Sequence, residues 1–420
     1  MTPLPSEETF DLLIIGAGPA GISAALAAAP SGARIAVIDD NPLPGGQIWR
    51  DGPAARLPAR ALQLRARLQA CANVVVYGDT RVIALSGTQQ LLLENAERGW
   101  HLRYGQLILC TGARERLLPF PGWTLPGVTG AGGLQALCKG GVPLTGERLV
   151  VAGSGPLLLA SAATARKAGA QLLRVAEQAP RHSIAHFALG LWAWPAKAVQ
   201  AAVLLNRHYR TNSHVLEAFG DGQLQGVRMS IAGRVEEIAC DRLAVGFGLV
   251  PNVQIGQAMG CALASQAIAV DTWQAASVPG HYAAGECTGF GGSELACIEG
   301  TIAGLAATGQ ADEARSLWPQ RQHWQSFADS LERTFSLQPA LKSLARDDTL
   351  ICRCEDVTLR QLRQQPGWTA AKMSSRCGMG ACQGRVCGTA TQFMFGWDAP
   401  APRPPFVPAR VSTLALLAKP

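Results

Sequence analysis

Five cysteines lie close together near the C-terminal end of the sequence. They fall within 36 consecutive positions, whereas the other seven of the twelve cysteines are scattered over 384 positions. Cys352 and Cys354 form a C-x-C arm, and Cys377, Cys382 and Cys387 follow in a glycine-rich segment. Iron–sulfur clusters are usually held by four cysteine thiolates. The segment therefore predicts a [2Fe-2S] site.

Zinc and purely structural thiols are the alternatives for this segment. Four thiolates also suit zinc, but its paired ligands are usually spaced more widely than in a C-x-C arm. Disulfides are not expected, because residues 1–8 lack the features of a signal peptide and a cytosolic chain keeps its thiols reduced. For a cluster, the first arm is Cys352 with Cys354, and the second is Cys382 with Cys387, which we favour, or with Cys377.

A dinucleotide-binding pattern occupies the N-terminal end. Residues 10–15 predict a buried parallel strand, residues 22–29 a helix, and residues 34–38 a second strand that ends at Asp39. Gly16 turns the chain, Gly18 lets the backbone approach a pyrophosphate, and Gly21 lets helix and strand pack closely. The helix N-terminus offers N–H donors to phosphates, and Asp39 is placed to accept from a ribose hydroxyl. The motif residues are Gly16, Gly18, Pro19, Ala20 and Gly21.

Three later segments indicate FAD rather than NAD. Residues 44–50 follow the acid where flavoproteins with two dinucleotide-binding domains run their backbone along the ribityl chain, and residues 107–113 match their strand with a Thr-Gly turn. Residues 283–286 match the late strand whose acid, usually Asp, meets the ribityl hydroxyls, so we expect a longer contact from Glu here. The positions expected to bind FAD in these segments are Gly46, Gln47, Thr111, Gly112, Gly285 and Glu286.

A second unit of the same kind begins at residue 148. Strands are predicted at 148–152 and 172–176, with a glycine turn at 153–158 and a helix at 159–168 between them. Leu158 replaces the third glycine, which should push the helix off the strand and narrow the phosphate groove. We therefore expect a domain that does not use NAD(P), and a working nicotinamide site is the alternative.

An apolar stretch follows at residues 184–205, with Trp192 and Trp194. It predicts either a partner surface or a pair of core helices, with interfacial membrane contact as a third option.

The cysteine pattern C-x-C-E-D…R-C-G-M-G-x-C-Q-G-R-x-C-G resembles the bacterioferritin-associated-ferredoxin-like domain of the flavoprotein subunit of multi-subunit amino-acid dehydrogenases. That family includes opine oxidases, D-hydroxyproline dehydrogenase, dye-linked L-proline dehydrogenase and hydrogen cyanide synthase. The resemblance implies the ligands Cys352, Cys354, Cys382 and Cys387, with Cys377 at a position that is cysteine in some members. It also implies an FAD-containing, substrate-oxidising β subunit, leaves room for a small γ subunit, and allows FMN shared with a partner.

These motifs predict an α/β fold, namely a flavoprotein with two Rossmann-like dinucleotide-binding domains and a small α-helical [2Fe-2S] domain at the C-terminal end. The expected parts are an FAD domain at 1–120 and 245–310, an NAD(P)-like domain at 121–244, a helical linker at 311–346, the cluster domain at 347–395 and a proline-rich tail at 396–420. We expect the tail to lie extended along the FAD domain or a partner.

Composition excludes other classes of protein. The net charge of +7 is dispersed without a basic run of five, which argues against nucleic-acid binding. No apolar run reaches the roughly 18 residues of a membrane span. We expect a cytoplasmic chain, with a peripheral link to the respiratory chain at the inner membrane as an option.

FAD and a cluster together indicate electron transfer through protein, because flavins exchange one or two electrons and clusters one. We assign no residue to acid–base catalysis. The resemblance implies the electron-transfer subunit of a hetero-oligomeric dehydrogenase that oxidises an amino acid, an imino acid such as D-hydroxyproline or proline, or an opine at its C–N bond. The alternatives are a stand-alone NAD(P)H-dependent reductase and a non-catalytic assembly subunit stabilised by a nucleotide.

Overall fold

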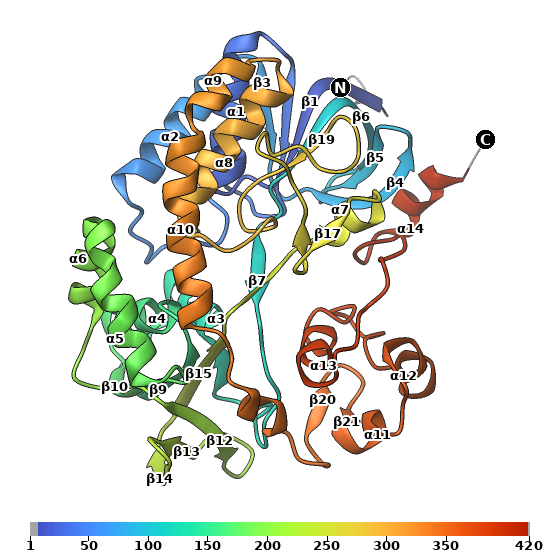
Figure 1. Cartoon of the computed structure of the whole chain (residues 1–420). Helices are drawn as coiled ribbons and strands as arrows, with labels where there is room; N and C mark the ends of the chain where they lie inside the picture. The colour runs from blue at the N-terminus through green and yellow to red at the C-terminus, as the bar shows by residue number, and fades with distance from the viewer. Residues whose placement is uncertain (1–6, 419–420) are drawn as a thin grey trace.

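The computed structural model describes residues 7–418, and its first unit is built around a seven-stranded sheet in the order β3-β2-β1-β6-β5-β4, with β19 also pairing with β6 (Figure 1). The pairs among β1, β2, β3, β6 and β19 are parallel, and β4 and β5 add antiparallel pairs. The strands are β1 Glu7–Ile15, β2 Ile35–Ile38, β3 Val74–Tyr77, β4 Arg81–Gly87, β5 Gln90–Glu94, β6 Gly99–Leu109 and β19 His281–Ala283. The helices are α1 Pro19–Ala28, η1 Ala29–Ser31, α2 Ala59–Gln69 and α8 Gly292–Ala307.

Strand β1 forms the centre of this sheet because its apolar run is covered on both faces, as is usual for interior parallel strands. Helices α1 and α8 lie against each other with their backbones almost in contact. A Cβ atom at Gly300 would stand 2.0 Å from the carbonyl oxygen of Ala20, and one at Gly304 would stand 2.3 Å from that of Ala24. Glycine is therefore required at both positions of α8.

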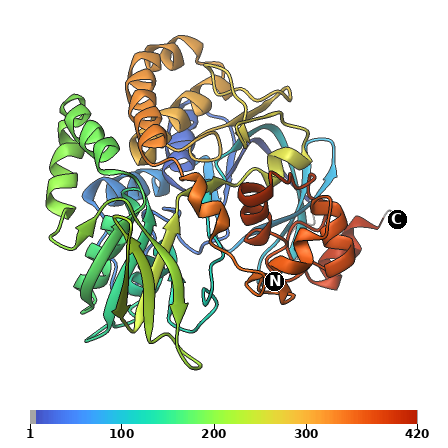
Figure 2. The ribbon, with the colours of Figure 1, turned by 60° about the horizontal axis from the view of Figure 1, so that its bottom comes forward.

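The second unit has a five-stranded parallel sheet in the order β11-β10-β9-β15-β8 and a three-stranded antiparallel sheet, β12-β13-β14, which comes forward in Figure 2. Its strands are β8 Val128–Gly130, β9 Arg148–Ser154, β10 Gln171–Glu177, β11 Tyr209–Arg210, β12 Ser213–Phe219, β13 Gly226–Ile231, β14 Arg234–Ala239 and β15 Arg242–Phe247. Its helices are α3 Ala131–Lys139, α4 Leu157–Lys167, α5 Arg181–Gly190, η2 Leu191–Ala193 and α6 Pro195–Leu204.

Two short antiparallel strands, β7 Ala113–Glu115 and β16 Leu249–Pro251, carry the chain between the two units. The chain returns to the first unit through α7 Gln254–Ala258, β17 Leu263–Ala264 and β18 Ala267–Ile268. After α8, the helices α9 Ala311–Ser316 and α10 Trp318–Thr334 follow, and α10 descends beside the second unit to η3 Pro339–Ser343 (Figure 1).

A small C-terminal unit comes next, with β20 Leu350–Cys352, β21 Val357–Thr358, α11 Leu359–Arg363, α12 Trp368–Ser375 and α13 Cys387–Phe395. The tail, with α14 Val411–Leu414 and η4 Ala415–Leu417, then runs along the first sheet. Phe406 donates its N–H to the carbonyl of Ile83 at 2.8 Å, and Arg410 donates its N–H to the Glu94 carboxylate at 2.9 Å. The α/β class agrees with the sequence-based prediction, whereas the tail, which was expected to be extended, is helical at 411–417.

The apolar stretch at 184–205 forms a helical hairpin on the surface rather than a core pair. Within it only Leu191 is buried. Its inner side packs on α10 through Phe187 and Trp194, which contact Phe327 at ring-centroid distances of 6.2 and 5.3 Å. Its outer side exposes Leu189, Trp192, Val199, Val203 and Leu205, each by more than half. Within residues 7–418, no helix combines the length and the hydropathy that a membrane span requires.

Candidate cofactor sites

The predicted dinucleotide motif lies where β1, β2, β6 and β19 end at the same edge of the first sheet, which is where ligands bind in open α/β sheets. A Cβ atom at Gly16 would stand 2.1 Å from the Cys110 carbonyl oxygen, and one at Gly21 would stand 1.8 Å from the Gly16 carbonyl oxygen. Gly18 is different, since the nearest atom to its Cβ position is the Cα of Gly46 at 3.9 Å. Two glycines therefore close the turn, and Gly18 leaves a backbone surface that a pyrophosphate could approach.

The acid at the end of β2 is buried beside this turn. Asp39 accepts hydrogen bonds from the N–H of Ala17 at 2.5 Å and from the N–H of Asn41 at 2.8 Å. Pro19 begins α1 after the cap residue Gly18, no acidic residue occupies the first turn, and Ala20 is buried against α8. The N-terminus of α1 thus keeps its positive end available for phosphate.

The predicted ribityl segment faces the motif at Gly46. A Cβ atom at Gly46 would stand 3.1 Å from the Cα of Gly18, so the two glycines face each other. The side chain of Gln47 instead accepts from Arg50, at 2.9 Å from Nη2 and 3.2 Å from Nε.

The Thr-Gly turn after β6 is tied to the connection between the two units. The Thr111 hydroxyl donates to the Asn252 carbonyl at 2.5 Å, and Asn252 returns two bonds, each 2.9 Å long, to the carbonyls of Thr111 and Gly112. Asn252 was not identified from the sequence, although it directly follows the buried strand β16.

The late acid, Glu286, has no hydrogen-bond partner for its carboxylate among residues 7–418, although burial raises its pKa. Its side chain is partly exposed, and ligand hydroxyls could supply donors to the carboxylate. The open backbone at Gly18, the acid Asp39 and the unpartnered Glu286 together fit the phosphates, ribose and ribityl chain of FAD.

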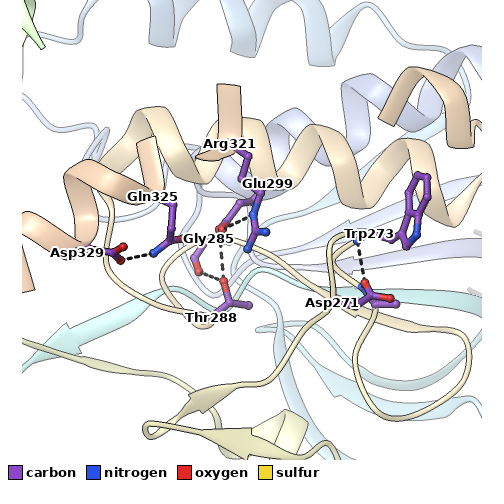
Figure 3. Close-up of polar contacts among 9 residues, drawn as sticks. Asp271, Trp273, Gly285, Thr288, Glu299, Arg321, Gln325 and Asp329 are labelled. Atoms are coloured by element: carbon purple, nitrogen blue, oxygen red, sulfur yellow. Dashed lines mark hydrogen bonds and ion pairs between the residues drawn. The ribbon is translucent and has the colours of Figure 1, made fainter. Parts of the chain in front are cut away.

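One residue that holds this loop in place was missed in the sequence. Glu299 of α8 is buried and accepts from the Gly285 N–H at 3.0 Å and from the Thr288 hydroxyl at 3.3 Å, while Arg321 of α10 pairs with its other oxygen at 3.3 Å (Figure 3). Burial is the largest influence on Glu299 and raises its pKa. Its signal in the sequence is an acid in the middle of an apolar helix, whose other acid, Glu294, lies in the first turn.

The second glycine loop is covered by the chain itself. Ser154 donates its hydroxyl to the Phe335 carbonyl at 2.8 Å, and Gln178 donates to the Ser336 carbonyl at 3.0 Å. Gln338 reinforces this contact with two bonds to Gln178, at 3.0 and 2.6 Å. The segment 335–338 therefore lies against the glycine turn and the residue that follows the terminal acid, at the edge where the dinucleotide of such domains would lie.

The terminal acid of this second motif, Glu177, and the residue at its third glycine position, Leu158, are both buried in the second unit. Glu177 is fully buried and accepts from the N–H groups of Gly155 at 2.7 Å and Ala179 at 2.9 Å, and burial raises its pKa to about 7. Leu158 is fully buried, and it lies near Gly246 of β15, where a Cβ atom would stand at an ordinary contact distance of 3.6 Å from it. The branched side chain is accommodated in the core of the second unit.

The five cysteines form two groups in the C-terminal unit. The Sγ atoms of Cys352, Cys377 and Cys387 are buried and lie within 4.8 Å of one another. Cys354 and Cys382 lie in a more exposed position, where each thiol influences the pKa of the other. Each thiol of the C-x-C arm thus meets a thiol of the glycine loop, because β20 ends at Cys352 and the chain turns before Cys354.

The three buried thiols could hold a metal ion, and Cys377 is one of them. The hydrogen bond from the Cys377 thiol and burial raise the pKa of Cys387. Burial also opposes ionisation of Cys382, but backbone N–H groups at Val386, Gly384 and Arg385, together with the Cys354 thiol, outweigh it and lower the pKa of Cys382. Such N–H groups are what stabilises thiolates and cluster sulfurs.

Glycine is needed in the loop for close packing. A Cβ atom at Gly380 would stand 2.2 Å from the Cβ of Cys354, and one at Gly378 would stand 2.6 Å from the Trp368 ring. Three of the four loop glycines, at 378, 384 and 388, have the Trp368 ring as their nearest neighbour.

Arg114 of β7 lies between the Thr-Gly turn and the cysteine loop. Its guanidinium donates to Asn252 Oδ1 at 2.9 Å, to the Pro251 carbonyl at 3.2 Å and to the Arg385 carbonyl at 3.3 Å. Burial, followed by the charge of Arg385, lowers the pKa of Arg114 to about 10. A cavity of about 960 Å³ opens beside it, with Arg114, Lys372, Arg385 and Arg403 on its wall.

Comparisons with known proteins place this geometry in context. Residues 10–312 match the pyridine nucleotide-disulphide oxidoreductase family. The chain is 34% identical to hydrogen cyanide synthase subunit HcnB of Pseudomonas aeruginosa, with 89% of this chain and 90% of that protein covered. It is 30% identical to one of the subunits of opine oxidase of Rhizobium meliloti, with 98% of this chain and 88% of that protein covered.

Solved structures agree on the fold. L-proline dehydrogenase from P. horikoshii superposes with a TM-score of 0.70 at 18% identity, covering 97% of this chain and 80% of that chain. Thioredoxin reductase from T. acidophilum superposes with a TM-score of 0.57 at 23% identity, covering 73% of this chain and 99% of that chain. The resemblance and the Rossmann-like fold class predicted from the sequence are confirmed, and the family match supports FAD binding. The chain is an oxidoreductase that belongs to the pyridine nucleotide-disulphide oxidoreductase family and is related over most of its length to subunits of hydrogen cyanide synthase and of opine oxidase.

Proposed function

We propose that this chain is the FAD- and [2Fe-2S]-containing electron-transfer subunit of a hetero-oligomeric dehydrogenase that oxidises an amino acid, imino acid or opine at its C–N bond. One observation carries the proposal: the thiols of the C-x-C arm and the glycine loop lie together, and Arg114 links that loop, through Asn252, to the Thr-Gly turn of the FAD unit. When bound, the flavin would exchange one or two electrons and the cluster one. The residues of the chain hold these groups and set their separation.

The FAD would be held by residues from four strand ends. The turn at 16–21 and the N-terminus of α1 would receive the pyrophosphate, with Gly18 and Gly46 forming its floor. Asp39 would accept from the adenosine ribose, and Glu286 would receive the ribityl hydroxyls that its unpartnered carboxylate lacks. Thr111 and Gly112 would lie at the flavin end.

The cluster would be held by Cys352, Cys354, Cys382 and Cys387, as the family motif implies. Their grouping into a buried pair and a more exposed pair supports this set. Cys377 is the alternative to one of the buried ligands, because its thiol is equally close.

The covered second glycine loop argues against a stand-alone NAD(P)H-dependent reductase. Segment 335–338 is bonded to Ser154 and Gln178, where a nicotinamide dinucleotide would otherwise lie. We propose that the second unit serves as a scaffold.

A partner subunit would supply the substrate chemistry, since the related proteins are named as subunits. The exposed face of the hairpin at 184–205 supports such an assembly, because large apolar side chains at a surface are typical of interfaces. Within the substrate classes we favour D-hydroxyproline or a proline-like imino acid. The cavity with four cationic side chains would suit the phosphate of an FMN shared with the partner.

Oxidation of candidate substrates by the purified chain, alone and with its partner, tests the proposal. The chain alone should contain flavin and iron yet reduce no dye with D-hydroxyproline, L-proline, glycine or an opine. Rapid turnover of one of these by the isolated chain would contradict it. Adenine nucleotide without flavin in the extracted chain would instead favour a role in assembly.

A further inference from the structure

We propose that Arg114 is the positioning residue that couples the FAD site to the cysteine loop, holding the loop at a fixed distance from the flavin and placing a positive charge between the two groups. The inference rests on the proposed function. The step that it serves is the transfer of one electron between flavin and cluster, in either direction, with no bond made or broken.

A chain of hydrogen bonds connects the Thr-Gly turn to the cysteine loop. From the Thr-Gly turn, Asn252 is bound by three hydrogen bonds to Thr111 and Gly112, and its side-chain oxygen accepts from Arg114 at 2.9 Å. From there the Nε of Arg114 donates to the carbonyl of Arg385 at 3.3 Å. Arg385 lies midway between Cys382 and Cys387. A path of two side chains and short hydrogen bonds therefore joins the predicted flavin turn to the loop that carries two cluster ligands.

Arg114 also lies close in sequence to the Thr-Gly turn. Arg114 lies two residues after Gly112 in β7, and β7 pairs with β16, so its backbone is fixed by both units. The register places Arg114 opposite Val250, one residue before Pro251 and two before Asn252. The guanidinium is thus anchored near the Thr-Gly turn and extends toward the cysteine loop. If its hydrogen bond to the Arg385 carbonyl were lost, the cysteine loop would shift.

The positive charge of Arg114 has no carboxylate partner in the described part of the chain. Among residues 7–418, no carboxylate forms an ion pair with Arg114, although the residue is only partly exposed and the charge of another cation, Arg385, lies nearby. A cation that loses water without a counter-ion is costly. A cluster with four thiolates would supply that counter-charge. In return, a fixed cation favours the form with an extra electron, which raises the midpoint potential.

The test uses the full-length chain with FAD and cluster bound, and three variants. Arg114→Met removes the charge and the contacts, whereas Arg114→Lys keeps the charge and loses the planar fork. Trp123→Phe is the matched control, because the Trp123 indole N–H donates to the Leu350 carbonyl at 2.7 Å and so joins the body to the same C-terminal unit away from the flavin turn.

Two readouts separate a coupling role from a merely structural one. The first is the midpoint potential of the cluster, titrated by EPR. The second is the rate at which an electron distributes between flavin and cluster after a pulse of a photogenerated one-electron reductant, followed by flavin absorbance and rapid-freeze EPR. Iron and flavin contents are measured for every sample.

We expect Arg114→Met to lower the cluster potential and to slow the electron distribution about tenfold, and Trp123→Phe to change neither. The fall in cluster potential is expected to change the one-electron equilibrium constant between flavin and cluster about tenfold, which corresponds to about 59 mV. Arg114→Lys should keep the potential and lose part of the rate, and it carries the test if the methionine variant fails to retain its cluster.

If the wild-type chain contains iron and both Arg114 variants show the wild-type cluster potential and rate of electron distribution, the inference is wrong and the proposed function stands. Equal effects in Trp123→Phe and Arg114→Met would also overturn it, since general loosening of the C-terminal unit would then be sufficient. An iron-free wild-type chain would overturn the proposed function itself.

Discussion

Substituting Glu299 with Ala should weaken FAD binding without a direct contact to the cofactor. The carboxylate holds the loop that carries Glu286 by accepting from the Gly285 N–H at 3.0 Å and from the Thr288 hydroxyl at 3.3 Å (Figure 3). Gly285 is buried and has a φ of +77°, a conformation that glycine adopts without strain.

The expected magnitude follows from the lost hydrogen bond. A bond to a charged acceptor contributes about 1.5–3 kcal/mol. If FAD must then order the loop itself, a loss of about 2 kcal/mol corresponds to roughly 30-fold weaker binding. Arg321→Met removes the cation that pairs with Glu299 but leaves the loop contacts, so its effect should be smaller.

The assay is titration of FAD-depleted protein with FAD, followed by the quenching of flavin fluorescence. Glu294→Gln is the matched control, because Glu294 lies on the same helix and pairs with Lys197 at 2.9 Å instead of with the loop. It should bind FAD within about twofold of wild type. A folded Glu299→Ala variant with wild-type affinity would refute the positioning role.

Three further outcomes follow from the structure. Burial raises the folded-state pKa of Glu177 to about 7, so the folded chain binds more protons than the unfolded chain between about pH 4.5 and pH 7. The free energy of unfolding should therefore fall by about 3 kcal/mol as the pH rises through this range. In denaturant titrations, Glu177→Gln should flatten this pH dependence. NADH and NADPH should not bleach the flavin in anaerobic mixing, and rapid bleaching would contradict the covered second site. Cys354→Ser should lower the iron content about as much as Cys382→Ser, whereas iron retention in Cys377→Ser would exclude Cys377 as a ligand.

Features set by neighbouring residues could be predicted from the sequence. The strand at 10–15, the glycine turn and Asp39 are consecutive, and the chain has few ways to arrange a buried strand followed by such a turn. The structure places Gly16, Gly18 and Gly21 as that pattern requires, with Gly46 opposite Gly18.

Features that depend on distant segments could not be predicted. Segment 335–338 covers the loop at Ser154 only because α10 descends along the second unit, and no local pattern encodes that path. The pairing of the thiols across the C-x-C arm depends on where β20 ends, and the roles of Glu299 and Arg114 depend on neighbours far away in sequence. For Glu299, the available signal was an acid in the middle of an apolar helix.

The most direct test of the central claim is the metal, sulfide and flavin content of the anaerobically purified chain, with an EPR spectrum after reduction. The purified chain should contain FAD together with about two irons and two acid-labile sulfides, and it should give the EPR signal of a reduced [2Fe-2S] cluster. Stoichiometric zinc without sulfide, or a folded chain with flavin but no iron after anaerobic isolation, would contradict it.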